Sequence, residues 1–171
     1  MIRLLEPFSS NLSKRLRKSP KIYWRDSGLL HALMQVKNMD DLFSQPWVGA
    51  SWEGFVIEQI INHLKASDKL FSVYHLRTSD QYEIDLVLDF GGKLCSIEIK
   101  LTSSPSMDDV RRFKKTSQLI DSDQCIMVSR TTAPLITKES VSTNLSGILE
   151  YLSENYSYSI SILILSFESL N

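Results

Sequence analysis

The 171-residue chain has few of the residues that mark several common classes of protein. Its two cysteines, Cys95 and Cys125, fall in expected strands, which favours buried, reduced thiols over a disulfide framework. Three scattered histidines with no neighbouring cysteine exclude the usual zinc-ligand spacings. No apolar run is long enough to span a membrane, and no signal peptide is visible. We therefore expect a cytoplasmic protein with no membrane contact.

The chain also lacks the G-x-x-x-x-G-K-[ST] phosphate loop, so no ATPase activity is expected from it. Its net charge of −1 gives no overall attraction to nucleic acid. The charge is uneven, however, because residues 1–37 carry eight Lys/Arg and only two acidic residues. With 43% hydrophobic residues, the chain is long enough to bury one core, and no internal repeat or second domain is visible.

Residues 82–101 contain the most informative pattern, two alternating apolar strands joined at Gly91-Gly92. Such a pair is favoured in two-residue hairpin loops because both positions adopt positive φ. If the two flanking residues close this turn, Asp85 lies directly opposite Glu98. Facing carboxylates repel unless a cation lies between them, so this register predicts a divalent-metal site. Lys100 follows Glu98 by two residues and is expected on the same face.

A helical pattern over residues 51–64 adds a third carboxylate, with Ser51 as the expected N-cap. Glu53 falls near the middle of the apolar stripe, whereas Glu58 lies off it and is expected at the surface. The stripe consists of Val56, Ile57, Ile60 and Leu64. An acidic side chain on a buried face is costly unless it is paired or coordinated. We therefore expect Glu53 to converge with the two strand carboxylates and Lys100.

Glu on a first helix, Asp on a strand and Glu-x-Lys on the next strand resemble the PD-(D/E)XK superfamily, the restriction-endonuclease-like nucleases. More closely, the chain resembles the C-terminal domain of unknown function of a large family of prokaryotic AAA-type ATPases. The resemblance covers most of residues 14–130 and is carried by Lys18-Ser-Pro-Lys-Ile-Tyr-Trp-Arg-Asp-Ser-Gly-Leu-Leu30, Trp52-Glu-Gly-Phe-Val56, Tyr82-Glu-Ile-Asp-Leu-Val-Leu88 and Ile97-Glu-Ile-Lys100.

Two departures accompany this resemblance. Ile84 precedes Asp85 where the superfamily's name has proline. The ATPase module that precedes the domain in the closer family is missing, which indicates a truncated protein, a split protein or a copy that has lost its motor. The resemblance implies an ATPase module as a partner, in cis or in trans.

The resemblance also implies a role for each residue of the pattern. It implies Mg²⁺ or Mn²⁺ held by Asp85, Glu98 and the carbonyl of Ile99, for cleavage of DNA. Lys100 would orient or deprotonate the attacking water, and Glu53 would assist the metal or Lys100. Hard oxygen ligands and a metal-activated water are the chemistry that such a site supplies.

The expected element order is α-β-β-β-α-β, an α/β fold with a mixed sheet of about four strands flanked by helices. Residues 1–21 are expected to form a basic arm, and residues 22–171 a single domain. The expected helices cover 27–36, 51–64, a segment from Ser106 with a capping-box-like Asp109, and 145–153. A loop is expected at 37–50. The expected strands cover 71–77, the hairpin, 124–129 and 156–165.

Basic residues of the arm and of the Ser106 helix are candidate contacts to nucleic-acid phosphates. They are Lys14, Arg15, Arg17, Lys18 and Lys21 in the arm, and Arg111, Arg112, Lys114 and Lys115 in the helix.

Plainer interpretations of the same residues remain open. Glu83, Asp85, Glu98 and Lys100 would then form a solvated strand face, with Glu83 and Lys100 as a surface pair of little energy. Ile84 and Leu86 would share one core on the opposite face. The basic residues would be a solvated linker and helix surface. Two other functions also stay open: a catalytically inactive module that binds nucleic acid or a partner protein, and a structural dimerisation domain.

Overall fold

The structure is a computed structural model of the chain and describes residues 1–8, 19–137 and 141–156. Its main sheet has the strand order β3-β4-β5-β6-β8-β7. These strands are β3 (Ser72–Arg77), β4 (Glu83–Asp89), β5 (Leu94–Ile99), β6 (Gln124–Val128), β7 (Leu135–Ile136) and β8 (Val141–Thr143). Antiparallel pairing joins β3 to β4 and β4 to β5, whereas β5, β6 and β8 are parallel. The expected mixed α/β sheet is confirmed, with two short strands added.

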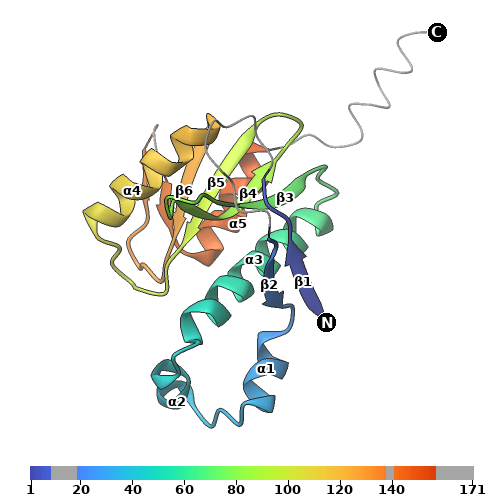
Figure 1. Ribbon diagram of the computed structural model, residues 1–171, viewed down its shortest axis with the longest axis vertical. Helices are drawn as coiled ribbons and strands as arrows, with labels where there is room; N and C mark the ends of the chain where they lie inside the picture. Colours follow the sequence, from blue (N-terminus) through green and yellow to red (C-terminus); the bar gives the residue numbers. More distant parts are fainter. Residues whose placement is uncertain (9–18, 138–140, 157–171) are drawn as a thin grey trace, which may run out of the picture.

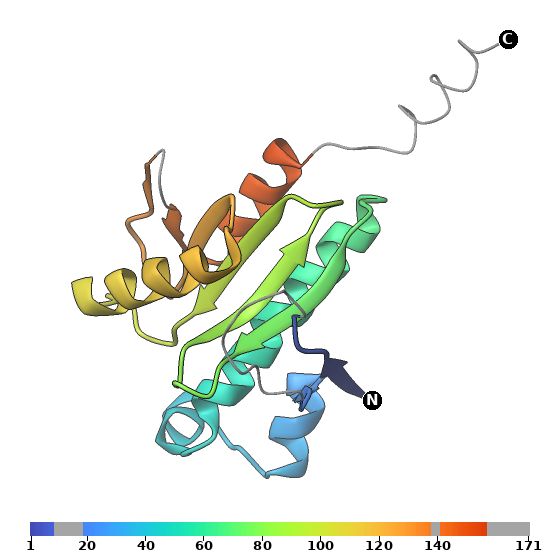
Figure 2. The ribbon, with the colours of Figure 1, turned by 45° about the horizontal axis from the view of Figure 1, so that its top comes forward.

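Helices cover both faces of this sheet (Figures 1 and 2). They are α1 (Ser27–Leu33), α2 (Met39–Ser44), α3 (Val48–Ala66), α4 (Met107–Ser117), the short 3₁₀ helix η1 (Gln118–Ile120) and α5 (Leu145–Asn155). The larger core joins α3 and α5 to one face, and a smaller core joins α4 to the other. The order α3-β3-β4-β5-α4-β6 is the expected one. None of the helices in the described part of the chain combines the length and apolarity needed to cross a membrane.

Several expected boundaries differ. Helix α3 begins at Val48, so the expected N-cap, Ser51, is a residue of its first turn. The Ser51 hydroxyl instead forms a hydrogen bond with His31 Nε2 at 2.8 Å. The expected loop at 37–50 contains α2, which is capped by the side chain of Asn38. The capping box of Ser106 and Asp109 at the start of α4 is confirmed. The expected strand at 156–165 lies outside the described residues, apart from Tyr156.

The central hairpin has the predicted register from the turn to Leu86–Ile97, but the predicted Asp85–Glu98 pair lies beyond the regular ladder. Leu86 pairs with Ile97, and the Phe90 amide donates to the Lys93 carbonyl at 3.0 Å. Gly91-Gly92 adopts φ of +70° and +99°, as this turn requires. Leu86–Ile97 is the last regular pair between β4 and β5. Residues before Leu86 in β4 and after Ile97 in β5 do not pair with each other in the ladder.

A β-bulge lies beside this point. Between the pairs Tyr74–Val87 and Leu76–Ile84, β4 advances three residues while β3 advances two. Ile84 therefore packs in the smaller core, whereas Leu86 packs in the larger one. The plainer interpretation, which placed both residues in one core, is wrong on this point, because an extra residue reverses the side on which the next side chain lies.

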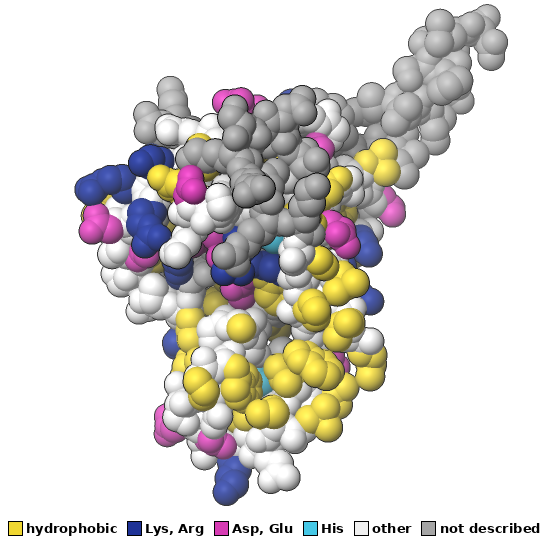
Figure 3. All heavy atoms as spheres, in the orientation of Figure 1, with side chains coloured by type: hydrophobic (Ala, Val, Ile, Leu, Met, Phe, Trp, Pro, Cys, Tyr) yellow, Lys and Arg dark blue, Asp and Glu magenta, His cyan; other side chains and the backbone are white. Residues whose placement is uncertain are grey.

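Part of the expected basic arm is a strand. Residues 2–5 form β1 (Ile2–Leu5), which pairs antiparallel with β2 (Lys21–Trp24) as a two-stranded ribbon beside α3. The candidate contacts Lys14, Arg15, Arg17 and Lys18 lie outside the described residues. Hydrophobic side chains gather over the ribbon and the neighbouring α1 and α2 (Figure 3). On the ribbon they are the exposed Ile2, Leu4, Ile22 and Trp24.

Candidate functional site

A polar pocket of about 300 Å³ lies where β4 begins and β5 ends, with α3 and α4 contributing to its walls. All four predicted catalytic residues line it, namely Glu53, Asp85, Glu98 and Lys100. The other lining residues include Glu83, Ile99, Asp109, Arg112 and Thr116. The structure therefore brings together the helix carboxylate and the hairpin residues, as the sequence predicts. The alternative of a fully solvated strand face is wrong, since Asp85 is only 7% exposed.

Asp85 connects the two strands of the hairpin beyond their last regular pair. Its Oδ2 accepts a hydrogen bond from the buried Ile99 amide at 2.9 Å. Its Oδ1 lies 3.1 Å from Nζ of Lys21. Both oxygens of Asp85 thus have partners, and the side chain replaces the backbone bond that ordinary pairing would supply at this place.

Lys21 is the residue of the site that sequence reasoning missed. Its Nζ lies 3.0 Å from Glu53 Oε1 and 3.1 Å from Asp85 Oδ1. It also lies 2.5 Å from Glu83 Oε1, so Glu83 pairs with Lys21 and not with Lys100. Burial alone would lower the pKa of Lys21, but the carboxylates of Asp85 and Glu53 outweigh this effect and raise it. The expected phosphate contact is instead a charged ammonium held among three carboxylates.

A signal for Lys21 was present in the sequence. Residues 21–24 alternate as Lys-Ile-Tyr-Trp, so Lys21 and Tyr23 share one face of a strand and Ile22 and Trp24 the other. The structure places the first pair toward the carboxylates and leaves the second pair exposed.

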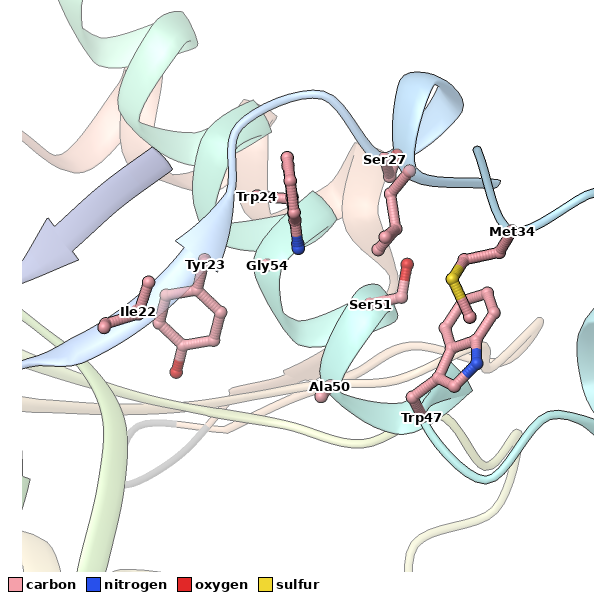
Figure 4. A pocket seen from close by; sticks show the side chains of 10 residues that line it. Ile22, Tyr23, Trp24, Ser27, Met34, Trp47, Ala50, Ser51 and Gly54 are labelled. Atoms are coloured by element: carbon pink, nitrogen blue, oxygen red, sulfur yellow. The ribbon is translucent and has the colours of Figure 1, made fainter. Parts of the chain in front are cut away.

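Tyr23 joins the polar pocket to an apolar one. Its hydroxyl donates to Glu53 Oε1, while its ring lines a pocket of about 300 Å³ between β2, α1 and α3 (Figure 4). The ring fits closely because the adjacent helix residue is Gly54, where a Cβ atom would lie 3.2 Å from Tyr23 Cδ1. Burial and then the charge of Asp85 raise the pKa of Glu53 despite its bonds to Lys21 and Tyr23.

Glu98 carries an unpartnered oxygen. Its Oε1 lies 2.8 Å from Nζ of Lys100, whereas its Oε2 is buried and has no hydrogen-bond partner. Burial, followed by the charge of Asp85, raises the pKa of Glu98 to about 7. Burial would lower the pKa of Lys100, but its bond to Glu98 raises it.

Glu58 corrects another expectation. It is only 2% exposed, and its carboxylate bonds Arg3 of β1 and Arg25 just after β2. The β1–β2 ribbon covers the side of α3 that the sequence pattern assigned to solvent. These ion pairs attach the ribbon to α3.

The basic residues of α4 divide into two pairs. Arg112 lines the polar pocket, and Lys115 lies 5.7 Å from the ring centre of Tyr82, another lining residue. Arg111 is exposed and pairs with Asp108 at 3.0 Å, while Lys114 borders a separate small cavity beside β6 and β8. Only one of the two pairs is therefore near the carboxylates.

The fit of a metal ion depends on two features of the pocket. In the ranges 1–8, 19–137 and 141–156, no three His, Cys, Asp or Glu side chains converge as a ready-made metal site. The buried Glu98 Oε2, beside Asp85, nevertheless offers an unsatisfied hard oxygen donor. Mg²⁺ typically binds through one or two carboxylates and completes its shell with water and phosphate oxygens. Asp85 and Glu98 fit that requirement.

Comparison with known proteins places the chain in a family. Residues 48–146 match the model described as Domain of unknown function (DUF4143), and the chain belongs to this family. A second model, Domain of unknown function (DUF8612), matches residues 1–40. The first range contains the four predicted catalytic residues, and the second contains the ribbon with Lys21.

Two mycobacterial relatives share a large part of this sequence. They are the uncharacterized proteins Rv2008c of Mycobacterium tuberculosis and Mb2031c of Mycobacterium bovis. Each is 41% identical over 121 residues, which cover 71% of this chain and 26% of the relative. The match thus spans about a quarter of the length of these curated relatives.

Proposed function

We propose that this domain is a metal-dependent phosphodiesterase of the PD-(D/E)XK type that acts on DNA. The observation that supports this proposal most strongly is the buried, unpartnered Oε2 of Glu98 in a polar pocket beside Asp85 and Lys100. An unsatisfied buried acceptor is costly to the folded state and is characteristic of sites that a ligand completes. A carboxylate whose pKa is raised to about 7 by burial and a neighbouring acid is likewise typical of functional sites.

Each residue has a role in this proposal. Asp85 and Glu98 hold Mg²⁺ or Mn²⁺, with the Ile99 carbonyl as a further ligand. When bound, such an ion lowers the pKa of a water molecule and stabilises charge on a phosphate. Lys100, whose pKa is raised by its bond to Glu98, orients the water or the phosphate and stabilises negative charge. Glu53, which lines the pocket, holds the ammonium group of Lys21 through its Oε1.

The proposed setting is a larger prokaryotic protein in the cytoplasm. We infer that the domain works with an AAA-type ATPase module, in cis or in trans. The motif resemblance supports this partner, and the length of the mycobacterial relatives is consistent with additional domains. Arg112 and Lys115, at the pocket and beside it, are suitably placed to contact DNA phosphates.

Titration calorimetry with Mn²⁺ tests the metal site directly. Wild type is expected to bind about one ion per chain, and Glu98→Gln at least about tenfold more weakly, because a neutral amide is a poorer ligand for a hard cation. Asp108→Asn is the matched control, since this carboxylate is exposed outside the pocket. Equal binding by wild type and Glu98→Gln, or no binding by either, would exclude Glu98 as a ligand.

A catalytically inactive DNA-binding module is the second candidate. It is favoured by Lys21, which already supplies positive charge between Glu53 and Asp85. Under this alternative, DNA binding persists without divalent metal and in Glu98→Gln, and no cleavage occurs.

In either case, neutralising a pocket arginine is expected to weaken DNA binding. Arg112→Gln should reduce the salt dependence of the binding constant by about one unit of slope, because one phosphate contact is lost. Arg111→Gln, on the same helix but paired with Asp108, is the control and should leave the slope unchanged. Fluorescence anisotropy at several salt concentrations measures both. Identical slopes would show that DNA does not approach this pocket.

A further inference from the structure

We propose that Lys21 is a built-in cation of the carboxylate pocket and competes with the divalent metal for the carboxylate of Asp85. This inference rests on the proposed metal site and adds a means of regulating it. Metal affinity is then set by how firmly strand β2 holds Lys21 among the carboxylates.

The contacts of Asp85 show where the competition occurs. Its Oδ1 lies 3.1 Å from Nζ of Lys21, and its Oδ2 accepts the Ile99 amide. Any ion held by Asp85 therefore binds a carboxylate that already neutralises an ammonium group. Two positive charges at such short range repel, and the repulsion is stronger between largely buried groups than in open water. Metal binding and the Lys21 contact thus weaken one another.

Three carboxylates surround the single positive charge of Lys21. Glu53, Glu83 and Asp85 contact the same nitrogen, and among the residues that the structure describes only Glu83 has a further cation, Arg77, at 3.8 Å. A simple structural ion pair would need one carboxylate for one lysine. The excess negative charge is what a divalent ion requires, and it becomes available when the ammonium group moves away.

The position of Lys21 in the fold permits such movement. It lies on the two-stranded β1–β2 ribbon and not in the six-stranded sheet. A two-stranded ribbon has little stability of its own and depends on its attachments. The attachments to α3 include the ion pairs of Arg3 and Arg25 with Glu58 and the Tyr23–Glu53 bond. Because Tyr23 also bonds Glu53, that carboxylate keeps a partner when the flexible lysine chain withdraws.

The test compares Mn²⁺ affinity in variants of Lys21 by titration calorimetry. Lys21→Met removes the charge at similar length and is expected to bind Mn²⁺ more tightly, by roughly ten- to a hundredfold, the range of typical coupling between two ligands. Lys21→Arg keeps the charge and should stay near wild type. Lys69→Met is the control, since Lys69 bonds the carbonyls of Ser153 and Tyr156 away from the pocket. As a second readout, Mg²⁺ should raise the Tm of Lys21→Met more than that of wild type.

The outcomes separate the two proposals. Measurable binding by wild type with equal or weaker binding by Lys21→Met overturns competition but leaves the metal site standing. No binding by either protein overturns both. If Lys21→Met does not fold, the lysine ammonium signals of the wild-type protein in nitrogen-15 NMR replace it. A Lys21 signal that shifts on saturation with Mg²⁺ supports the proposal, and an unchanged signal contradicts it.

Discussion

Replacing Lys21 with methionine is expected to lower the free energy of unfolding by about 3 kcal/mol at pH 7 without divalent metal. The reason is that buried carboxylates lose the cation that neutralises them, and removing one partner of a buried ion pair is strongly destabilising. The side chains of Lys21 and Asp85 are only 16% and 10% exposed, so water compensates little. Chemical unfolding followed by circular dichroism measures the change.

Acid should reduce the difference in the free energy of unfolding between Lys21→Met and wild type. As the pH falls and carboxyl groups gain protons, Lys21 has less negative charge to neutralise. The raised pKa of Glu53 makes it an early group to protonate. Lys69→Met again serves as the control for the loss of a half-buried lysine. A destabilisation no larger than that of the control at pH 7 would show that the carboxylates do not depend on Lys21.

Replacing Glu58 with alanine is expected to cost about 3–4 kcal/mol at pH 7. Arg3, whose side chain is 13% exposed, would be left as a buried, unpaired charge. Arg25 is half exposed and is affected less. The ribbon would also lose an attachment to α3. Chemical unfolding measures the stability, and Glu150→Ala, a surface carboxylate on α5, is a suitable control.

Glu58 also determines the direction in which folding stability changes with pH. Burial alone would raise the pKa of Glu58, but the hydrogen bond and charge of Arg3, with help from Arg25, lower it below 4.5. A lowered pKa contributes stability that is present above the unfolded value and is lost as pH falls through the folded value. Glu58→Gln should therefore lose less stability than wild type on acidification below about pH 4.5. Parallel declines in the two proteins would contradict this assignment.

The parts of the site that the sequence predicted are those governed by local geometry. The turn at Gly91-Gly92 fixes the hairpin register as far as Leu86–Ile97, which brings Asp85 and Glu98 to one pocket at the end of the hairpin. The helical stripe likewise placed Glu53 on the inner side of α3. Each of these features depends only on residues that are close together in the chain, so the amino-acid pattern is sufficient to predict it.

The missed residues depend on contacts between distant segments. Lys21 meets Asp85 across 64 positions of sequence, and Arg3 meets Glu58 across 55. A helical pattern identifies one apolar face and cannot show that a separate ribbon covers another. The bulge at β4 was not predicted for a similar reason. Alternation of apolar residues does not reveal an extra residue, which becomes visible in the pairing of β4 with β3.

The end of the β4–β5 ladder has a practical consequence for observing this protein. The Ile99 amide is bonded to the Asp85 side chain, at a point beyond the last regular pair of the hairpin. Its hydrogen-exchange rate therefore depends on one carboxylate as well as on the sheet. A single backbone proton, already present in the native chain, is a reporter of the occupancy and charge of the pocket.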